Sequence, residues 1–279
     1  MHGISWSIAA AIALAPVPSA AQVPPEREPG GVPWQAQIYT NFTAWTAEEL
    51  ADRDEWDLAH RCGGSLIAQG WVLTAAHCIT QAKVDKGYRV RLGAIHLNTQ
   101  EGVTYRIDRM VRHADYDAPR HLNDIALVHY VADATTDEAA AATPINLIPL
   151  YEGEPLGVGV KVQASGWGQA EEGRNQGFQS ELTYVDLATV DCAELAEYRG
   201  KTDGTMLCAS APDTDTCTGD SGGPLIIDRD VPLQVGIVSW GRGCYRENSA
   251  GVYVRIDRNY YRDWINRAMA ADPSLNVLR

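Results

Sequence analysis

The sequence predicts an all-β fold built from many short strands. From Trp34 onward, apolar segments of strand length, rich in Val, Ile and Leu, alternate with Gly, Asn and Asp residues that favour turns. Long helical patterns are few, and 279 residues suffice for one large β unit or two small domains. Many short strands without long helices are typical of a sandwich or a barrel.

The expected strands follow the apolar segments along the chain. The clearest cover residues 35–39, 65–68, 71–74, 89–92, 125–129, 160–164, 224–227 and 235–240. Residues 131–143 are rich in Ala, Asp and Thr, and we interpret them as the connector between two halves.

Two helices are expected beside these strands. Residues 258–270 place Tyr261, Trp264, Ile265 and Met269 on one helical face, which predicts a C-terminal helix packed on the core. Earlier in the chain, Thr46 and Glu49 form a capping-box pattern that predicts a short acidic helix over 47–58.

The N-terminus has the pattern of an export signal. The apolar residues 8–15 are too few to span a bilayer, and proline and small residues at 16–21 suit signal-peptidase cleavage, although residues 1–7 contain no Lys or Arg. We predict a signal peptide over 1–21, a segment of undefined processing over 22–32, and secretion or export to the periplasm. No later segment is long enough to span a membrane.

Charge and cysteine content narrow the function classes. The 23 basic and 36 acidic residues give a formal charge of −13, which argues against nucleic-acid binding and which we interpret chiefly as a source of solubility. An even number of cysteines in an exported chain predicts disulfides, but six cysteines allow 15 pairings. A zinc site is disfavoured because the chain has no C-x-x-C pair. The cysteines are Cys62, Cys78, Cys192, Cys208, Cys217 and Cys244.

Three local motifs carry candidate catalytic groups. His77 ends the small-residue sequence LTAAH at 73–77, Asp124 opens an apolar strand in NDIAL at 123–127, and Ser221 lies between glycines in CTGDSGGPL at 217–225. Each has an ordinary alternative when taken alone: a surface or core histidine, a turn-capping aspartate, a glycine-rich turn. The glycines, however, expose the serine hydroxyl and let backbone N–H groups approach a developing oxyanion.

The sequence around Ser221 also contains G-x-S-x-G, the nucleophile pattern of α/β-hydrolases. That class has its triad in the order Ser, acid, His on alternating strands and helices. Here the order is His77, Asp124, Ser221, and β-α alternation is missing. We therefore exclude the α/β-hydrolase interpretation.

Together the motifs resemble the chymotrypsin/trypsin family of serine proteases, from about Pro33 to the end of the chain. Three more segments match: CGGSL at 62–66, SGWG at 165–168 and VSWG at 238–241. The resemblance implies two antiparallel six-stranded β-barrels with a C-terminal helix. The first would span 33–140 and the second 141–279, with the active site between them. It also implies the disulfides Cys62–Cys78, Cys192–Cys208 and Cys217–Cys244.

The resemblance further implies the roles of individual residues. Ser221 would be the nucleophile, His77 the general base and Asp124 the group that orients the imidazole, with the oxyanion held by the N–H groups of Gly219 and Ser221. Asp215, six residues before Ser221, would form the floor of the primary specificity pocket; the alternative is a surface-loop acid beside Asp213. Further substrate-binding positions would be Thr216, Ser239, Trp240, Gly241 and Gly251.

From this resemblance we expect a serine endopeptidase that cleaves after Arg or Lys and is inhibited by benzamidine-like cations. Its partners would be protein or peptide substrates and protein inhibitors, and we expect a monomer without a cofactor or metal. Ala94 stands where the family's calcium loop supplies its first acid, so no calcium is expected. The acidic insertion between Asn41 and His60 would border the leaving-group side of the site, where it either favours basic residues or is only a solvated surface.

The N-terminus departs from the family pattern. Family zymogens are cut to release an apolar end, whose amine pairs with the acid before the serine, here Asp220. The nearest match is Arg27 followed by EPGG at 28–31, which lacks the apolar residues. The partner of Asp220 is then the amine left by signal cleavage, another donor, or none. This leaves open a protease-like binding protein or a protease activated only by a partner.

Overall fold

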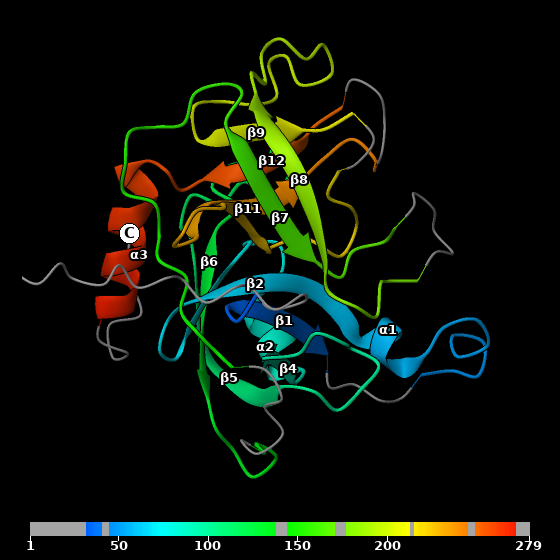
Figure 1. Ribbon diagram of the computed structural model, residues 1–279. Coiled ribbons are helices and arrows are strands. Elements are labelled where there is room, and N and C mark those ends of the chain that lie inside the picture. Colours follow the sequence, from blue (N-terminus) through cyan, green and yellow to red (C-terminus); the bar gives the residue numbers. More distant parts are fainter. Residues whose placement is uncertain are drawn as a thin grey trace, which may run out of the picture.

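The computed structural model describes residues 32–40, 45–137, 144–170, 177–212, 215–244 and 249–271. They form two closed, six-stranded antiparallel barrels, with the second barrel above the first in Figure 1. The predicted all-β fold of two barrels and a C-terminal helix is therefore confirmed. The expected signal peptide at 1–21 and nearly all of the 22–32 segment lie outside the described residues. No helix in the described ranges is long and apolar enough to cross a membrane.

The first barrel is closed by β1, which pairs with β2 on one side and β4 on the other. Its strand order is β1-β2-β3-β6-β5-β4. The strands are β1 (Gln35–Thr40), β2 (His60–Ala68), β3 (Trp71–Thr74), β4 (Tyr88–Leu92), β5 (Val103–Arg112) and β6 (Ala126–Val131).

The second barrel repeats this arrangement in the order β10-β11-β12-β9-β8-β7. Its strands are β7 (Lys161–Gly166), β8 (Thr183–Val190), β9 (Met206–Ser210), β10 (Pro224–Ile227), β11 (Leu233–Trp240) and β12 (Gly251–Arg255). Both barrels lie within the spans 33–140 and 141–279 that the resemblance implied.

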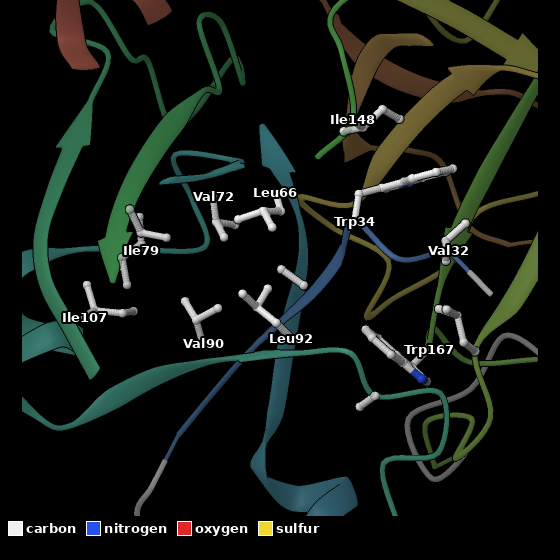
Figure 2. Close-up of a cluster of buried hydrophobic side chains, with 14 of the residues drawn as sticks. Val32, Trp34, Leu66, Val72, Ile79, Val90, Leu92, Ile107, Ile148 and Trp167 are labelled. Atoms are coloured by element: carbon white, nitrogen blue, oxygen red, sulfur yellow. The ribbon is translucent and has the colours of Figure 1, made fainter. Parts of the chain in front are cut away.

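One hydrophobic cluster extends from the first barrel into the second. Figure 2 shows Trp34 and Val32 beside Trp167, at one end of a cluster that continues through Leu66 and Val72 into the first barrel. Buried hydrogen bonds cross the same interface. Ser65 Oγ donates to Gln234 Oε1 at 2.7 Å, and Ser165 Oγ donates to Gln35 Oε1 at 2.8 Å. Because buried polar groups need such partners, these bonds fix how one barrel lies on the other.

The C-terminal helix α3 (Asn259–Ala270) follows the second barrel but packs against the first. Its buried face consists of Tyr261, Trp264, Ile265 and Ala268, close to the face expected from the sequence. These side chains meet Leu73 and Leu127 of the first barrel in a single cluster. The helix lies along one side of the molecule in Figure 1, so the chain end ties the two barrels together.

The acidic helix expected over 47–58 is wrong in extent. Helix α1 covers only Glu55–Ala59, and residues 47–52 form turns. The capping box itself is present, with Thr46 N donating to Glu49 Oε2 at 2.7 Å and Glu49 N donating to Thr46 Oγ1 at 3.2 Å. The capping box closes one turn, but no helix begins at that turn, because a helix of a few residues is marginal without packing. A second short helix, α2 (Gln81–Asp85), was not expected.

The six cysteines form the three disulfides that the resemblance implied. Cys62–Cys78 lies in the first barrel, and Cys192–Cys208 and Cys217–Cys244 lie in the second.

Candidate functional site

His77 follows β3 through two alanines that are fully buried. Their small side chains let the chain turn tightly after the strand, and Cys78 N donates to Ala75 O at 3.2 Å. The Cys62–Cys78 disulfide then anchors the turn to β2. The imidazole of His77 is left partly exposed, with 27% of its side chain accessible.

Asp124 lies behind His77 and has no exposed surface. Its carboxylate accepts three hydrogen bonds: from His77 Nδ1 at 2.7 Å, from His77 N at 2.9 Å and from Ser239 Oγ at 2.6 Å. Burial opposes ionisation of Asp124, but the hydrogen bonds and the nearby imidazole outweigh it and lower its pKa. A charged, fully bonded carboxylate therefore holds the Nδ1–H tautomer of His77, which leaves Nε2 free to accept a proton.

The turn before β6 needs an unusual backbone to place Asp124. His121 and Asn123 both have φ of +52°. Such left-handed geometry is uncommon outside glycine, although Asn and His are enriched in it. Asn123 is held by a hydrogen bond from the Tyr261 hydroxyl at 2.8 Å. The C-terminal helix thus supports the loop that carries the buried acid.

Ser221 lies in a tight turn that is pressed against the first barrel. Gly63 N of β2 donates to Ser221 O at 2.8 Å. The next residue, Gly222, has φ of +81°, and a Cβ there would lie 2.2 Å from Thr74 Oγ1. Only glycine fits this position, both because the backbone is left-handed and because the barrels approach closely.

The structure brings His77 and Ser221 close to the same disulfide sulfur. Cys78 Sγ lies 3.7 Å from His77 Nε2 and 3.6 Å from Ser221 O. Between these two described residues no Oγ–Nε2 hydrogen bond is formed. Bonds of this kind are often long in an enzyme without substrate, so the arrangement fits a nucleophile and its base.

Gly219 has φ of +103°, and its carbonyl accepts a hydrogen bond from His60 Nε2 at 3.0 Å. His60 is fully buried, and burial lowers its pKa to about 4. It is therefore neutral at pH 7, with the proton on Nε2, while Nδ1 faces Gln37 Nε2 at 3.3 Å. The carbonyl of Gly219 is thereby fixed in one direction.

Asp220 occupies a closely fitted cradle. Its carboxylate accepts Gly168 N at 2.8 Å and Cys217 N at 2.9 Å. A Cβ on Gly166 or Gly168 would lie 2.1 or 2.3 Å from its oxygens. Burial raises the pKa of Asp220 to about 6, because the two N–H donors offset only part of the desolvation and no cation pairs with it among the described residues.

Asp215 is also buried, with 5% of its surface exposed. Desolvation raises its pKa to about 6, while hydrogen bonds from Thr216 and Gly251 act in the opposite direction. Thr216 lies beside it, with its hydroxyl 3.3 Å from the Tyr253 hydroxyl. The Cys217–Cys244 disulfide follows directly. Asp215 is therefore no surface-loop acid, and no cation among the described residues pairs with its carboxyl, which is suited to binding one.

The remaining predicted substrate-binding positions lie at the end of β11 and the start of β12. Trp240 stacks at 24° on His121, with ring centroids 6.0 Å apart. Gly251 lies against Asp215, whereas a Cβ on Gly241 would meet nothing closer than 3.8 Å. An added side chain is therefore excluded by close contacts at Gly251 and not at Gly241.

Several residues of this site were missed from the sequence. Ser239 was expected only as a substrate-binding position, yet its hydroxyl donates a hydrogen bond to Asp124. His60 and His121 were not singled out, and no local pattern distinguishes them. His60 does stand two residues before Cys62, which is the one sequence signal that places it near the first disulfide.

Two sets of potential metal ligands occur within the described ranges, and both include His77. One contains the disulfide-bonded Cys62 and Cys78, whose sulfurs are not thiolates. The other combines His77 with His121 and Asp124, whose carboxylate already serves three donors. Neither set suggests a resident metal.

Comparison with known proteins agrees with this geometry. The family model for trypsin matches residues 24–265. Mouse tryptase is 32% identical over 252 residues, which covers 86% of this chain and 85% of tryptase. Trypsin eta of Drosophila erecta is 35% identical over 212 residues, covering 74% and 77% of the two chains. Among solved structures, mouse neuropsin, a serine protease, superposes with a TM-score of 0.66 at 31% identity, covering 87% of this chain and 96% of its own. The chain belongs to the trypsin family of serine proteases.

Proposed function

We propose that this protein is an exported serine endopeptidase that hydrolyses peptide bonds after Arg or Lys. The observation that carries the proposal is the buried carboxylate of Asp124, which is bonded to His77 Nδ1 at 2.7 Å beside the Ser221 turn. A scaffold has no need to bury a charge behind a partly exposed imidazole, because a buried carboxylate is costly.

In the proposed reaction, Ser221 Oγ attacks the peptide carbonyl as His77 Nε2 takes its proton. The carbonyl oxygen becomes an oxyanion held by the N–H groups of Gly219 and Ser221. His77 then gives the proton to the leaving amine, and an acyl-enzyme remains on Ser221. Water hydrolyses that ester by the same two proton transfers, while Asp124 stabilises the imidazolium.

The preference for Arg and Lys is supported by Asp215. A buried carboxyl without a neutralising cation binds a guanidinium or ammonium group through charge-assisted hydrogen bonds. Export is supported by the three disulfides, which persist in oxidising compartments. Protein and peptide substrates and protein inhibitors are the partners that we propose.

Covalent labelling tests the reaction most directly. A fluorophosphonate reacts only with an activated serine, so the proposal expects stoichiometric labelling of the wild-type protein and none of Ser221→Ala. Ser210→Ala, at the end of β9, is the matched control and should label normally. Labelling of Ser221→Ala would place the reactive group at another residue, and no labelling of a folded wild type would favour a protease-like binding protein. Labelling that appears only with an added factor would favour a partner-activated protease.

A further inference from the structure

The ion pair between Arg53 and Asp57 in the acidic insertion is hydrogen-bonded to the segment before β8. Asp57 of α1 is buried, and Arg53 donates to its carboxylate from Nε at 2.6 Å and from Nη2 at 2.9 Å. The same carboxylate accepts the backbone N–H of Phe178 at 2.7 Å. Because a buried carboxylate is stable only when paired and bonded, Asp57 holds Phe178 in place across 121 residues of sequence.

The ring of Phe178 lies directly against Gly219. A Cβ on Gly219 would lie 2.8 Å from both Cδ1 and Cε1 of the ring. The centroid of the ring also lies 5.3 Å from the guanidinium carbon of Arg53 and 4.8 Å from the ring centroid of His60, in a T-shaped arrangement. Phe178 therefore fills the space next to the α-carbon of Gly219, where a glycine alone leaves the backbone free to rotate.

His60, the first residue of β2, brings a second support to Gly219. It follows α1 directly, and its Nε2 donates to Gly219 O at 3.0 Å. The insertion thus reaches Gly219 twice, through the Phe178 ring and through the imidazole. Asp220, the next residue, has no cation against it among the residues that the structure describes. The insertion therefore adds to the backbone hydrogen bonds that already hold this turn, such as the one from Gly63 N to Ser221 O.

We propose that Arg53, Asp57 and Phe178 are positioning residues that hold Gly219 in the conformation that binds the oxyanion. The inference rests on the proposed function, because it assigns to the insertion a role in that same reaction. Asp57 is buried, unlike Glu48, Glu49, Asp52, Asp54 and Glu55 of the same insertion, which are exposed.

The test separates oxyanion binding from cation binding. A peptide aldehyde that ends in arginine adds to Ser221 Oγ and leaves an oxyanion near Gly219, whereas benzamidine uses only the pocket of Asp215. For Phe178→Ala and Asp57→Asn we expect kcat to fall about 10- to 100-fold, since a misplacement of about 1 Å can cost that much. Aldehyde affinity should fall in parallel. KM and benzamidine affinity should stay within about threefold of wild type, because the pocket that binds ground-state substrate is untouched.

Asp133→Asn is the matched control, because it breaks a comparable pair with Arg89, at 2.9 Å, elsewhere on the first barrel. This variant should bind the aldehyde and benzamidine with wild-type affinity. If Phe178→Ala does not fold, Phe178→Leu decides the question, since it keeps apolar volume and should lose less of kcat. Equal weakening of both inhibitors, or wild-type kcat in the folded variants, overturns the inference. A wild-type protein that binds no aldehyde and takes no fluorophosphonate overturns the proposed function instead.

Discussion

A Cβ atom on Gly251 would lie 3.0 Å from Asp215 Oδ1, and it would also lie 2.6 Å from the Tyr253 hydroxyl. A side chain at Gly251 would therefore displace Asp215 or its neighbours from their positions around the buried carboxylate. This contact links the proposed specificity to a single position that can be altered without touching His77, Asp124 or Ser221.

The first prediction concerns that position. Gly251→Ala should lower kcat/KM on arginine peptides by about 10- to 100-fold, which is the worth of a hydrogen bond to a charged group. Fluorophosphonate labelling should remain within about threefold. Gly157→Ala is the control, because nothing lies within 4 Å of its added methyl group. Undiminished cleavage by Gly251→Ala would show that the cation does not bind beside Asp215.

The second prediction is a pH dependence of cation binding. The pKa of Asp215 is raised to about 6 by burial, so the carboxyl loses its charge as pH falls through 6. Benzamidine stays cationic over this range. Its affinity, measured by calorimetry, should therefore be constant above about pH 7 and weaken toward about tenfold per pH unit below 6. Asp215→Asn should bind weakly, with a much flatter profile. A flat wild-type profile from pH 5 to 7 would contradict this assignment.

The third prediction concerns stability and Asp220. Its pKa is about 6 in the folded chain, against an ordinary value of 3.8. The folded state then holds the proton more tightly, so the cost of ionisation is absent below about pH 4 and complete above about pH 6. The rise in the pKa of Asp220 corresponds to a loss of roughly 3 kcal/mol in the free energy of unfolding once the carboxyl is ionised.

Urea unfolding in a Ser221→Ala background, which prevents self-digestion, measures this cost. Relative to the same chain with Asp220→Asn, the free energy of unfolding should fall by about 3 kcal/mol from pH 4 to 7. If the difference instead grows more favourable with pH, a cation must lie against Asp220 in the folded chain.

The fourth prediction extends the substrate class. A pocket of about 440 Å³ is lined by Arg120, Lys201 and Arg242 around Trp240. A peptide that pairs with the chain at 239–241 would pass this pocket on its way to Ser221. Although the protein is acidic overall, acidic side chains three or four residues before the cleaved bond should therefore raise kcat/KM, by about two- to fivefold per exposed pair.

Paired peptides with Glu or Gln at those positions measure the effect. It should shrink in high salt and in Lys201→Gln or Arg242→Gln, because exposed ion pairs are screened. Equal rates on both peptides at low salt would show that this pocket does not take part in substrate recognition.

The sequence alone determined much of the frame. The expected strands 71–74 and 224–227 match β3 and β10, and the apolar face of the C-terminal helix was recognised from three- and four-residue spacing. His77, Asp124 and Ser221 were singled out because each stands in a local motif and because the three motifs together resemble those of the trypsin family. Such features depend on residues within one turn or one strand, which a sequence records directly.

The tertiary structure decided the rest. The expected helix over 47–58 ended as one turn and the short α1, whose Asp57 is bonded to Arg53 and to the N–H of Phe178, far away in the sequence. The role of the Ser239 hydroxyl and the raised pKa of Asp220 likewise depend on burial between residues far apart in the chain. Desolvation and long-range contacts arise only when both barrels close and pack together, so no local pattern could have predicted that Phe178 would lie against Gly219.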